Sequence, residues 1–191
     1  MIAEHLAIRW DGHWKFRRAQ AVLLLPAEFP QYLRGRHRQA VRTNVRRARD
    51  AGLTVEHHPV EEWEPGSDDF RVAHITPGPV ERWNVIESDG RIVAQAILSV
   101  DGDVALLHGL MSTVTHARWL LHTAIVERLC GTSGVLLVNS DDAYLLAPGT
   151  RHFQRLLGYS VARLRLPRSP REQSKRSREL PAQNEAEPQG A

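Results

Sequence analysis

The chain has 191 residues, of which 42% are hydrophobic, enough for one domain of ordinary size with a buried core. Its 25 basic residues, only two of them lysine, barely exceed its 22 acidic ones, so the net charge is +3 and any strongly basic surface must be local. A single cysteine excludes a disulfide within the chain, and charged residues near the N-terminus argue against a signal peptide. No segment approaches the ~20 apolar residues that a membrane-spanning helix needs. The sequence therefore predicts a soluble cytoplasmic protein without a membrane partner.

The first predicted element is a β-hairpin. Residues 5–10 and 14–25 are extended and rich in apolar side chains, and Asp11-Gly12-His13 separates them. Pro26 ends the second strand because proline cannot continue a ladder of hydrogen bonds.

An arginine-rich helix is predicted next. Seven arginines fall within residues 34–49, and Gly52 follows them as a helix stop. Apolar residues line one side of this helix at Leu33, Ala40, Val41, Val45 and Ala48. Seven like charges repel each other, so the arginine face predicts an anionic partner, and the alternative is a merely solvated face.

The centre of the chain predicts three consecutive antiparallel strands. A strand near Thr54–Pro59, an acidic loop over residues 61–69 and an extended stretch near Phe70–Thr76 come before them. Asp89-Gly90 and Asp101-Gly102 are strong hairpin signals. They join predicted strands at Arg82–Glu87, Arg91–Val100 and Val104–Met111.

The C-terminal part predicts two helices that alternate with strands, followed by a tail. The elements are a helix at Thr115–Cys130, a strand at Gly134–Asn139, a helix at Gly149–Leu157 and a strand at Tyr159–Leu166. Residues 167–191 are rich in Pro, Ser, Gln, Arg and Glu and should be disordered. The expected architecture is a single α/β domain over residues 1–166, with one mixed, mostly antiparallel sheet flanked by helices.

Three segments and one hairpin resemble a known family. The segments are Leu25–Leu33, Arg42–Val55 and Pro148–Tyr159, and the hairpin is Asp89–Ala94. Their order resembles the GNAT fold of N-acyltransferases, and within it the FemAB-like branch. The resemblance implies transfer of an acyl or aminoacyl group from acyl-CoA or aminoacyl-tRNA to an amine acceptor. It also implies tRNA as a possible partner.

The chain departs from that family at two places. The stretch Ser112–Leu121 has no glycine where coenzyme A enzymes bring backbone close to a pyrophosphate, and Trp119 and Leu120 stand there instead. Phe153 replaces a tyrosine that acts as general acid in many GNAT enzymes. FemAB-like proteins, which take aminoacyl-tRNA or other bulky donors, tolerate both departures.

Four residues are candidates for proton transfer. Histidine in general has an unperturbed pKa suited to a base at neutral pH, which makes His108 on the third meander strand one candidate. Glu87 and Asp141 are alternative carboxylate bases. Tyr144 is the nearest replacement for the missing acid. The alternatives are a histidine packed within the sheet and carboxylates that are only solvated.

A second group of residues is expected to bind the donor or another anion. These residues lie on the arginine helix and at the start of the helix near Thr115: Arg42, Asn44, Arg46, Arg47, Ser112, Thr113, Thr115 and Arg118. The histidines show no metal-ligand spacing, so no metal is expected. The rival hypothesis is a catalytically inactive GNAT-shaped module that binds RNA or another polyanion through the arginine helix.

Overall fold

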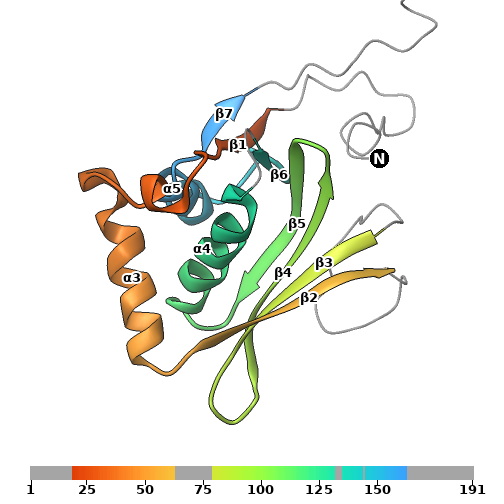
Figure 1. The fold of residues 1–191 in the computed structure, drawn as a ribbon. Coiled ribbons are helices and arrows are strands. Elements are labelled where there is room, and N and C mark those ends of the chain that lie inside the picture. Colours follow the sequence, from red (N-terminus) through yellow and green to blue (C-terminus); the bar gives the residue numbers. More distant parts are fainter. Residues whose placement is uncertain (1–18, 63–78, 132–134, 144, 163–191) are drawn as a thin grey trace, which may run out of the picture.

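The computed structural model describes residues 19–62, 79–131, 135–143 and 145–162 (Figure 1). In chain order the elements are β1 (Gln20–Leu24), α2 (Phe29–Tyr32), the 3-10 turn η1 (Arg36–Arg38), α3 (Gln39–Asp50), β2 (Thr54–Glu62), β3 (Pro79–Ile86), β4 (Ile92–Asp101), β5 (Val104–Ser112), α4 (Ala117–Cys130), β6 (Leu136–Asp142), α5 (Pro148–Leu157) and β7 (Ser160–Ala162). None of the helices in these ranges is long and apolar enough to cross a membrane.

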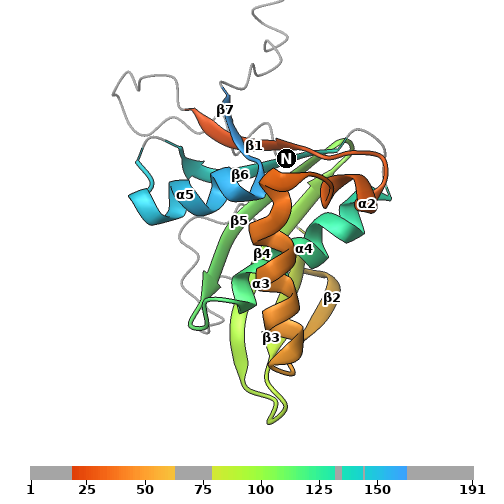
Figure 2. The ribbon, with the colours of Figure 1, turned by 90° about the vertical axis from the view of Figure 1, so that its left-hand side faces the viewer.

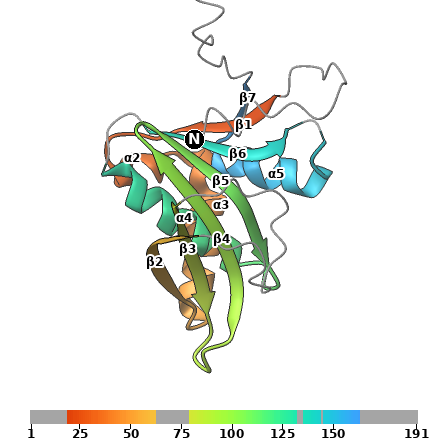
Figure 3. The same cartoon turned by 90° about the vertical axis from the view of Figure 1, so that its right-hand side faces the viewer.

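The strands form one mixed sheet in the order β2-β3-β4-β5-β6-β1-β7. β5 and β6 pair in parallel, and the other neighbours that the structure describes pair antiparallel. The helices lie together on one face of this sheet, as the view onto the strands shows (Figure 3). The predicted α/β architecture with a mixed, mostly antiparallel sheet is confirmed.

The core lies between the helices and the sheet. α4 supplies its centre, with Leu121 and Ile125 fully buried against Leu98 and Leu107 of the meander. A small second cluster on the opposite face of the sheet joins Val22, Leu106 and Val138. Because successive strand residues point to opposite faces, these clusters identify which side of each strand faces the helices.

The predicted meander is confirmed as β3, β4 and β5. Gly90 and Gly102 adopt φ values of 84° and 62° in the two turns, a conformation that glycine reaches without strain. The Asp89 carboxylate accepts a hydrogen bond of 3.0 Å from the backbone N–H of Arg91, which fixes the first turn.

The arginine helix begins later than the sequence predicts. Gly35 has a φ of 89° and interrupts the helical path, so the first three of the seven arginines lie in the loop and in η1, before α3 starts at Gln39. The predicted apolar stripe is confirmed for Val41, Val45 and Ala48, which are buried. Ala40 is half-buried, and Leu33 lies outside the helix, just after α2.

Several predictions fall outside the described residues. They are the first strand of the N-terminal hairpin, the stretch Phe70–Thr76 and the tail 167–191. Of the predicted acidic loop, Glu61 and Glu62 belong to β2, and the rest lies outside.

Candidate functional site

The candidate site lies where the two parallel strands separate. β5 and β6 pair from Val104 opposite Leu136 to Leu107 opposite Asn139. β5 nevertheless continues to Ser112, and β6 continues to Asp142. Ligands in α/β proteins commonly bind beyond the carboxyl ends of parallel strands, which makes this separation a natural position for a site.

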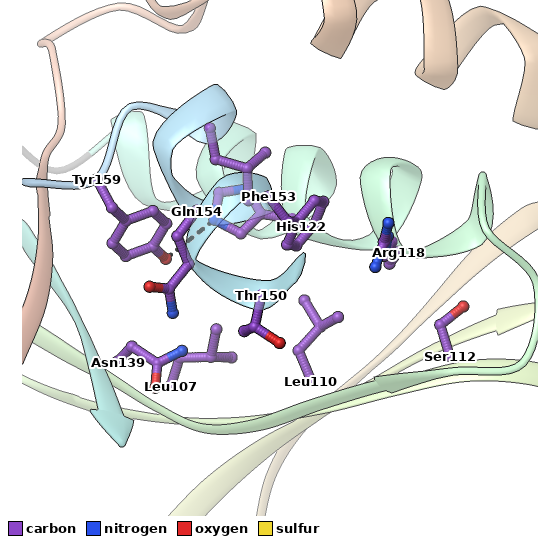
Figure 4. A pocket seen from close by; sticks show the side chains of 11 residues that line it. Leu107, Leu110, Ser112, Arg118, His122, Asn139, Thr150, Phe153, Gln154 and Tyr159 are labelled. Carbon is purple, nitrogen blue, oxygen red and sulfur yellow. Dashed lines mark hydrogen bonds between the residues drawn. The ribbon is translucent and has the colours of Figure 1, made fainter. Parts of the chain in front are cut away.

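A cavity of about 200 Å³ opens at this position. Its wall comes from two strands, two helices and Tyr159, the second residue after α5 (Figure 4). The lining residues are Leu107, Leu110 and Ser112 of β5, Arg118 and His122 of α4, Asn139 of β6, Thr150, Phe153, Gln154 and Leu157 of α5, and Tyr159.

Helical spacing explains why α4 and α5 face the cavity together. Arg118 and His122 are four residues apart, and Phe153 and Leu157 of α5 are also four apart, so each pair shares one face of its helix. Trp119 lies against Phe153 in an edge-to-face contact with ring centroids 4.7 Å apart. This buried contact locks the two helices and therefore fixes the shape of the cavity.

Buried His122 and half-buried Tyr159 form a neutral pair in the wall of the cavity. The His122 Nε2 and the Tyr159 hydroxyl oxygen lie 3.0 Å apart and share a hydrogen bond. Burial, with a smaller contribution from the charge of Arg38, lowers the pKa of His122 to about 3. Burial raises the pKa of Tyr159 well above its usual value, so the hydroxyl keeps its proton at neutral pH.

Buried polar atoms in the wall lack partners among the described residues. The Arg118 guanidinium carbon lies 4.5 Å from the centre of the Phe153 ring, and the Nε of Arg118 has no hydrogen-bond partner there. The same holds for Gln154 Nε2 and His122 Nδ1. An unsatisfied buried polar atom costs about 1–3 kcal/mol. These three atoms are themselves inaccessible, so they lie behind the cavity surface.

The predicted donor-binding residues fall into separate places. Ser112 and Arg118 line the cavity. The Ser112 hydroxyl donates a hydrogen bond of 2.6 Å to the carbonyl of Val114, and the Thr113 hydroxyl donates one of 3.2 Å to that of Val93. Thr115 is exposed in the turn before α4.

The residues of α3 lie away from the lining. The Asn44 amide oxygen lies 3.0 Å from His116 Nδ1, which joins α3 to the start of α4. Arg42 donates to the carbonyls of Leu33 and Gly35, and so closes the loop before the helix. Arg46 and Arg47 are exposed on α3, and Arg46 forms an ion pair with Asp50 at 3.5 Å.

The predicted proton-transfer residues are not gathered at the cavity. The ring of His108 lies 2.7 Å from the Ser99 hydroxyl, on the face of the sheet that carries Leu106 and turns away from the helices. Glu87 accepts a hydrogen bond of 2.9 Å from Arg91 across the first meander turn. Asp141 belongs to β6, and Tyr144 lies outside the described residues.

Among the polar lining residues that sequence reasoning missed are His122, Thr150, Gln154 and Tyr159. The spacing of Arg118 and His122 on one predicted helix was an available signal, because residues four apart share a face. Nothing in a linear pattern places Tyr159 against His122, since the contact joins segments 37 positions apart.

Three solved structures are similar to this fold. One is the C-terminal domain of a candidate lysylphosphatidylglycerol synthetase from Agrobacterium fabrum, with 14% identity, a TM-score of 0.51, and coverage of 75% of this chain and 57% of that chain. A conserved protein of unknown function from Bacteroides thetaiotaomicron has 11% identity, a TM-score of 0.50, and coverage of 77% and 60%. The L-PGS from Bacillus licheniformis has 12% identity, a TM-score of 0.49, and coverage of 82% and 62%.

The GNAT assignment is wrong. The fold is similar to a lysylphosphatidylglycerol synthetase domain, and not to a GNAT or FemAB-like acyltransferase. No family model matches the chain, and no curated protein matches it in sequence. The chain spans about three fifths of the length of the similar structures.

The motifs that suggested GNAT have local explanations. Gly158 ends α5 in the left-handed conformation with a φ of 91°, and Gly52 follows α3 with a φ of 75°. Gly90 serves a β-turn. Helix ends and hairpin turns of this kind occur in many folds. These glycines therefore indicate helix ends and turns and do not identify a protein family.

Proposed function

We propose that this domain is an aminoacyl transferase that takes its aminoacyl group from aminoacyl-tRNA. The acceptor nucleophile we propose is the hydroxyl of a phospholipid, in place of the amine that the sequence suggested. Support for the reaction class comes from the similar fold of the A. fabrum domain, which is described as part of a lysylphosphatidylglycerol synthetase. The observation that carries the proposal is the cavity at the end of the parallel strand pair.

The size of the cavity suits a single aminoacyl group. Pockets that bury a drug-sized ligand typically occupy ~300–1,000 Å³, whereas this one occupies about 200 Å³. Coenzyme A, with its nucleotide and long arm, is far larger than such a space. An amino acid esterified to a tRNA end could place its side chain inside while the nucleic acid stays outside.

Exposed arginines on α3 would receive the nucleic acid. α3 packs beside α4, the helix that supplies Arg118 and His122 to the cavity (Figure 2). Arg47 and Arg49 are exposed and form no ion pair with a described carboxylate, so their charge is available to phosphates.

The transfer exchanges one ester for another. The acceptor hydroxyl oxygen attacks the aminoacyl carbonyl carbon and gives up its proton, the bond from that carbon to the tRNA ribose oxygen breaks, and the ribose oxygen gains a proton. The net proton transfer is therefore from the acceptor hydroxyl to the ribose oxygen. Tyr159 is suited to face this leaving oxygen, because its strongly raised pKa allows it to protonate only a strongly basic oxygen such as an alkoxide. His122 positions the hydroxyl through their shared hydrogen bond.

The test is transfer of a labelled amino acid from charged tRNA to phosphatidylglycerol vesicles. Tyr159→Phe should lower the rate constant of transfer by about 10²-fold, the usual contribution of a general acid, with little change in tRNA affinity. Tyr32→Phe is the matched control, because Tyr32 is not among the lining residues and its buried hydroxyl donates to the carbonyl of Leu157. The proposal fails if wild-type protein transfers no label to any hydroxyl or amine acceptor.

A further inference from the structure

Arg118 lies at one end of the cavity, away from Tyr159. Figure 4 shows Arg118 near Ser112 at one end of the lining, and Tyr159 at the other. The guanidinium carbon of Arg118 lies 4.5 Å from the centre of the Phe153 ring, and this contact holds the side chain in place. One end of the cavity therefore carries a positioned guanidinium that stays charged at every physiological pH.

The two terminal nitrogens of this guanidinium are accessible. Nε is the only nitrogen of the Arg118 side chain that is both inaccessible and unpartnered. No hydrogen bond or ion pair joins the terminal nitrogens to a residue that the structure describes. A guanidinium with free N–H groups binds oxyanions, and its fork matches two oxygens of one phosphate group.

The geometry of the proposed reaction indicates which phosphate lies at this end. Tyr159 faces the leaving ribose oxygen, so the tRNA lies at the Tyr159 end. The arginine-rich segment is close to that end as well, because Arg38 donates to the Leu156 carbonyl at 3.2 Å. The acceptor then approaches from the opposite end and meets Arg118. In a phospholipid with a glycerol head group, a short carbon chain separates the phosphate from the accepting hydroxyl, so both groups reach their positions together.

We infer that Arg118 binds the phosphodiester of the acceptor phospholipid, and that the acceptor is therefore an anionic glycerol head group and not an uncharged lipid. Terminal N–H groups of the guanidinium donate to the phosphate oxygens. This inference rests on the proposed function, since it names the residue that positions the acceptor in the same site. A neutral lipid with the same hydroxyl offers no partner to Arg118 and should be a poor acceptor.

The first test measures binding without tRNA or a membrane. Glycerophosphoglycerol, which is the phosphatidylglycerol head group without acyl chains, and diglycerol, which has no phosphate, are titrated into the full chain by calorimetry. Glycerophosphoglycerol should bind at least tenfold more tightly than diglycerol. Equal binding of the two compounds, or no binding of glycerophosphoglycerol, overturns the inference.

Variants then test the residue. Arg118→Gln should remove the preference for glycerophosphoglycerol. Arg151→Gln is the matched control, because Arg151 is an exposed arginine of α5 that does not line the cavity, and the preference should remain. Circular dichroism checks the fold of each variant, and an unchanged preference in a folded Arg118→Gln variant contradicts the inference. If Arg118→Gln does not fold, Arg118→Lys decides, because it keeps the charge but loses the fork and should bind glycerophosphoglycerol several-fold more weakly than wild type.

Transfer kinetics separate this inference from the proposed function and from a nucleic-acid phosphate. With charged tRNA and phosphatidylglycerol vesicles, Arg118→Gln should raise the KM for lipid at least tenfold and leave the KM for tRNA within about twofold. A rise in the KM for tRNA alone would assign Arg118 to a tRNA phosphate and overturn the inference. If glycerophosphoglycerol binds through Arg118 but no charged tRNA is a donor, the proposed function fails and the phosphodiester site stands. If transfer occurs and Arg118→Gln changes neither KM, the function stands and the inference fails.

Discussion

His122 makes stability depend on pH because its imidazole is neutral in the folded protein. Burial lowers its folded pKa to about 3, while the unfolded chain has the ordinary value near 6.5. Below pH 6.5 the imidazole is therefore protonated in the unfolded state but stays neutral in the folded state. The free energy of unfolding should fall by up to about 1.4 kcal/mol per pH unit between pH 6.5 and about 3, and stay level above pH 7.

Urea denaturation at pH 7, 6 and 5 measures this slope, and His122→Gln should reduce it. His37→Gln is the control, since His37 is exposed in η1 and its removal should leave the slope intact. Tyr159 contacts His122 and the charge of Arg38 acts on it; the raised pKa of Tyr159 keeps its hydroxyl protonated across this range. A slope that survives in His122→Gln would show that other groups cause the acid sensitivity.

Gly158 is required by both conformation and space. Its φ of 91° lies in the left-handed region, and a β-carbon there would overlap the guanidinium of Arg38. Arg38 is held by donation to the carbonyls of Tyr32 and Leu156 at 3.2 Å each, so it cannot move without losing bonds. Gly158→Ala should lower the free energy of unfolding by more than about 2 kcal/mol.

The matched control for that variant is Gly52→Ala. Gly52 has a similar φ of 75°, but a β-carbon there meets nothing within 4 Å. Its cost should stay near 1 kcal/mol, from conformation alone. Equal losses in the two variants, measured by urea denaturation, would show that the contact with Arg38 contributes nothing.

Within the arginine-rich segment, structural and exposed arginines differ in their contacts. Arg42 closes the loop before α3 by donating to the carbonyls of Leu33 and Gly35, whereas Arg47 is exposed without a described partner. Arg42→Gln should lower the free energy of unfolding by about 1 kcal/mol, and Arg47→Gln should change it by less than about 0.5 kcal/mol. Thermal and urea unfolding of the two variants check the difference.

The exposed arginines of α3 should matter for nucleic acid instead. A variant that combines Arg46→Gln, Arg47→Gln and Arg49→Gln should keep its fold and bind tRNA more weakly. The dependence of the binding constant on salt should become shallower by about one unit of logarithmic slope per lost phosphate contact. Unchanged affinity and slope, measured by filter binding at several salt concentrations, would mean that this face is only solvated.

At the scale of the whole molecule, local signals predicted the elements but not the site. Short-range sequence patterns determine the turns at Gly90 and Gly102 and the buried stripe on α3. The meander and the helix could therefore be predicted from the sequence. The cavity depends on how α4 and α5 meet across Trp119 and Phe153, and this contact is tertiary. The sequence therefore pointed to Ser112 at the end of β5 and to Arg118 in the first turn of α4, and missed Gln154 and Tyr159.

The whole molecule should distinguish charged tRNA from coenzyme A. The hydroxyls of Ser112 and Thr113 before α4 already donate to the carbonyls of Val114 and Val93, and are not available to a pyrophosphate. A ligand that binds only the folded state at 100 times its Kd adds about 2.7 kcal/mol of stability. For a domain of this length, that raises the Tm by roughly 5–10 °C.

Thermal shift with charged tRNA, uncharged tRNA, coenzyme A and acetyl-CoA measures this difference. Charged tRNA should raise the Tm most, uncharged tRNA should raise it less because the cavity stays empty, and neither coenzyme should change it by more than about 1 °C. Equal shifts with the two tRNA forms would mean that the protein binds RNA through α3 without holding the aminoacyl group. A large shift with acetyl-CoA would contradict the aminoacyl-tRNA donor, because a cavity of about 200 Å³ would then be only part of a much larger site.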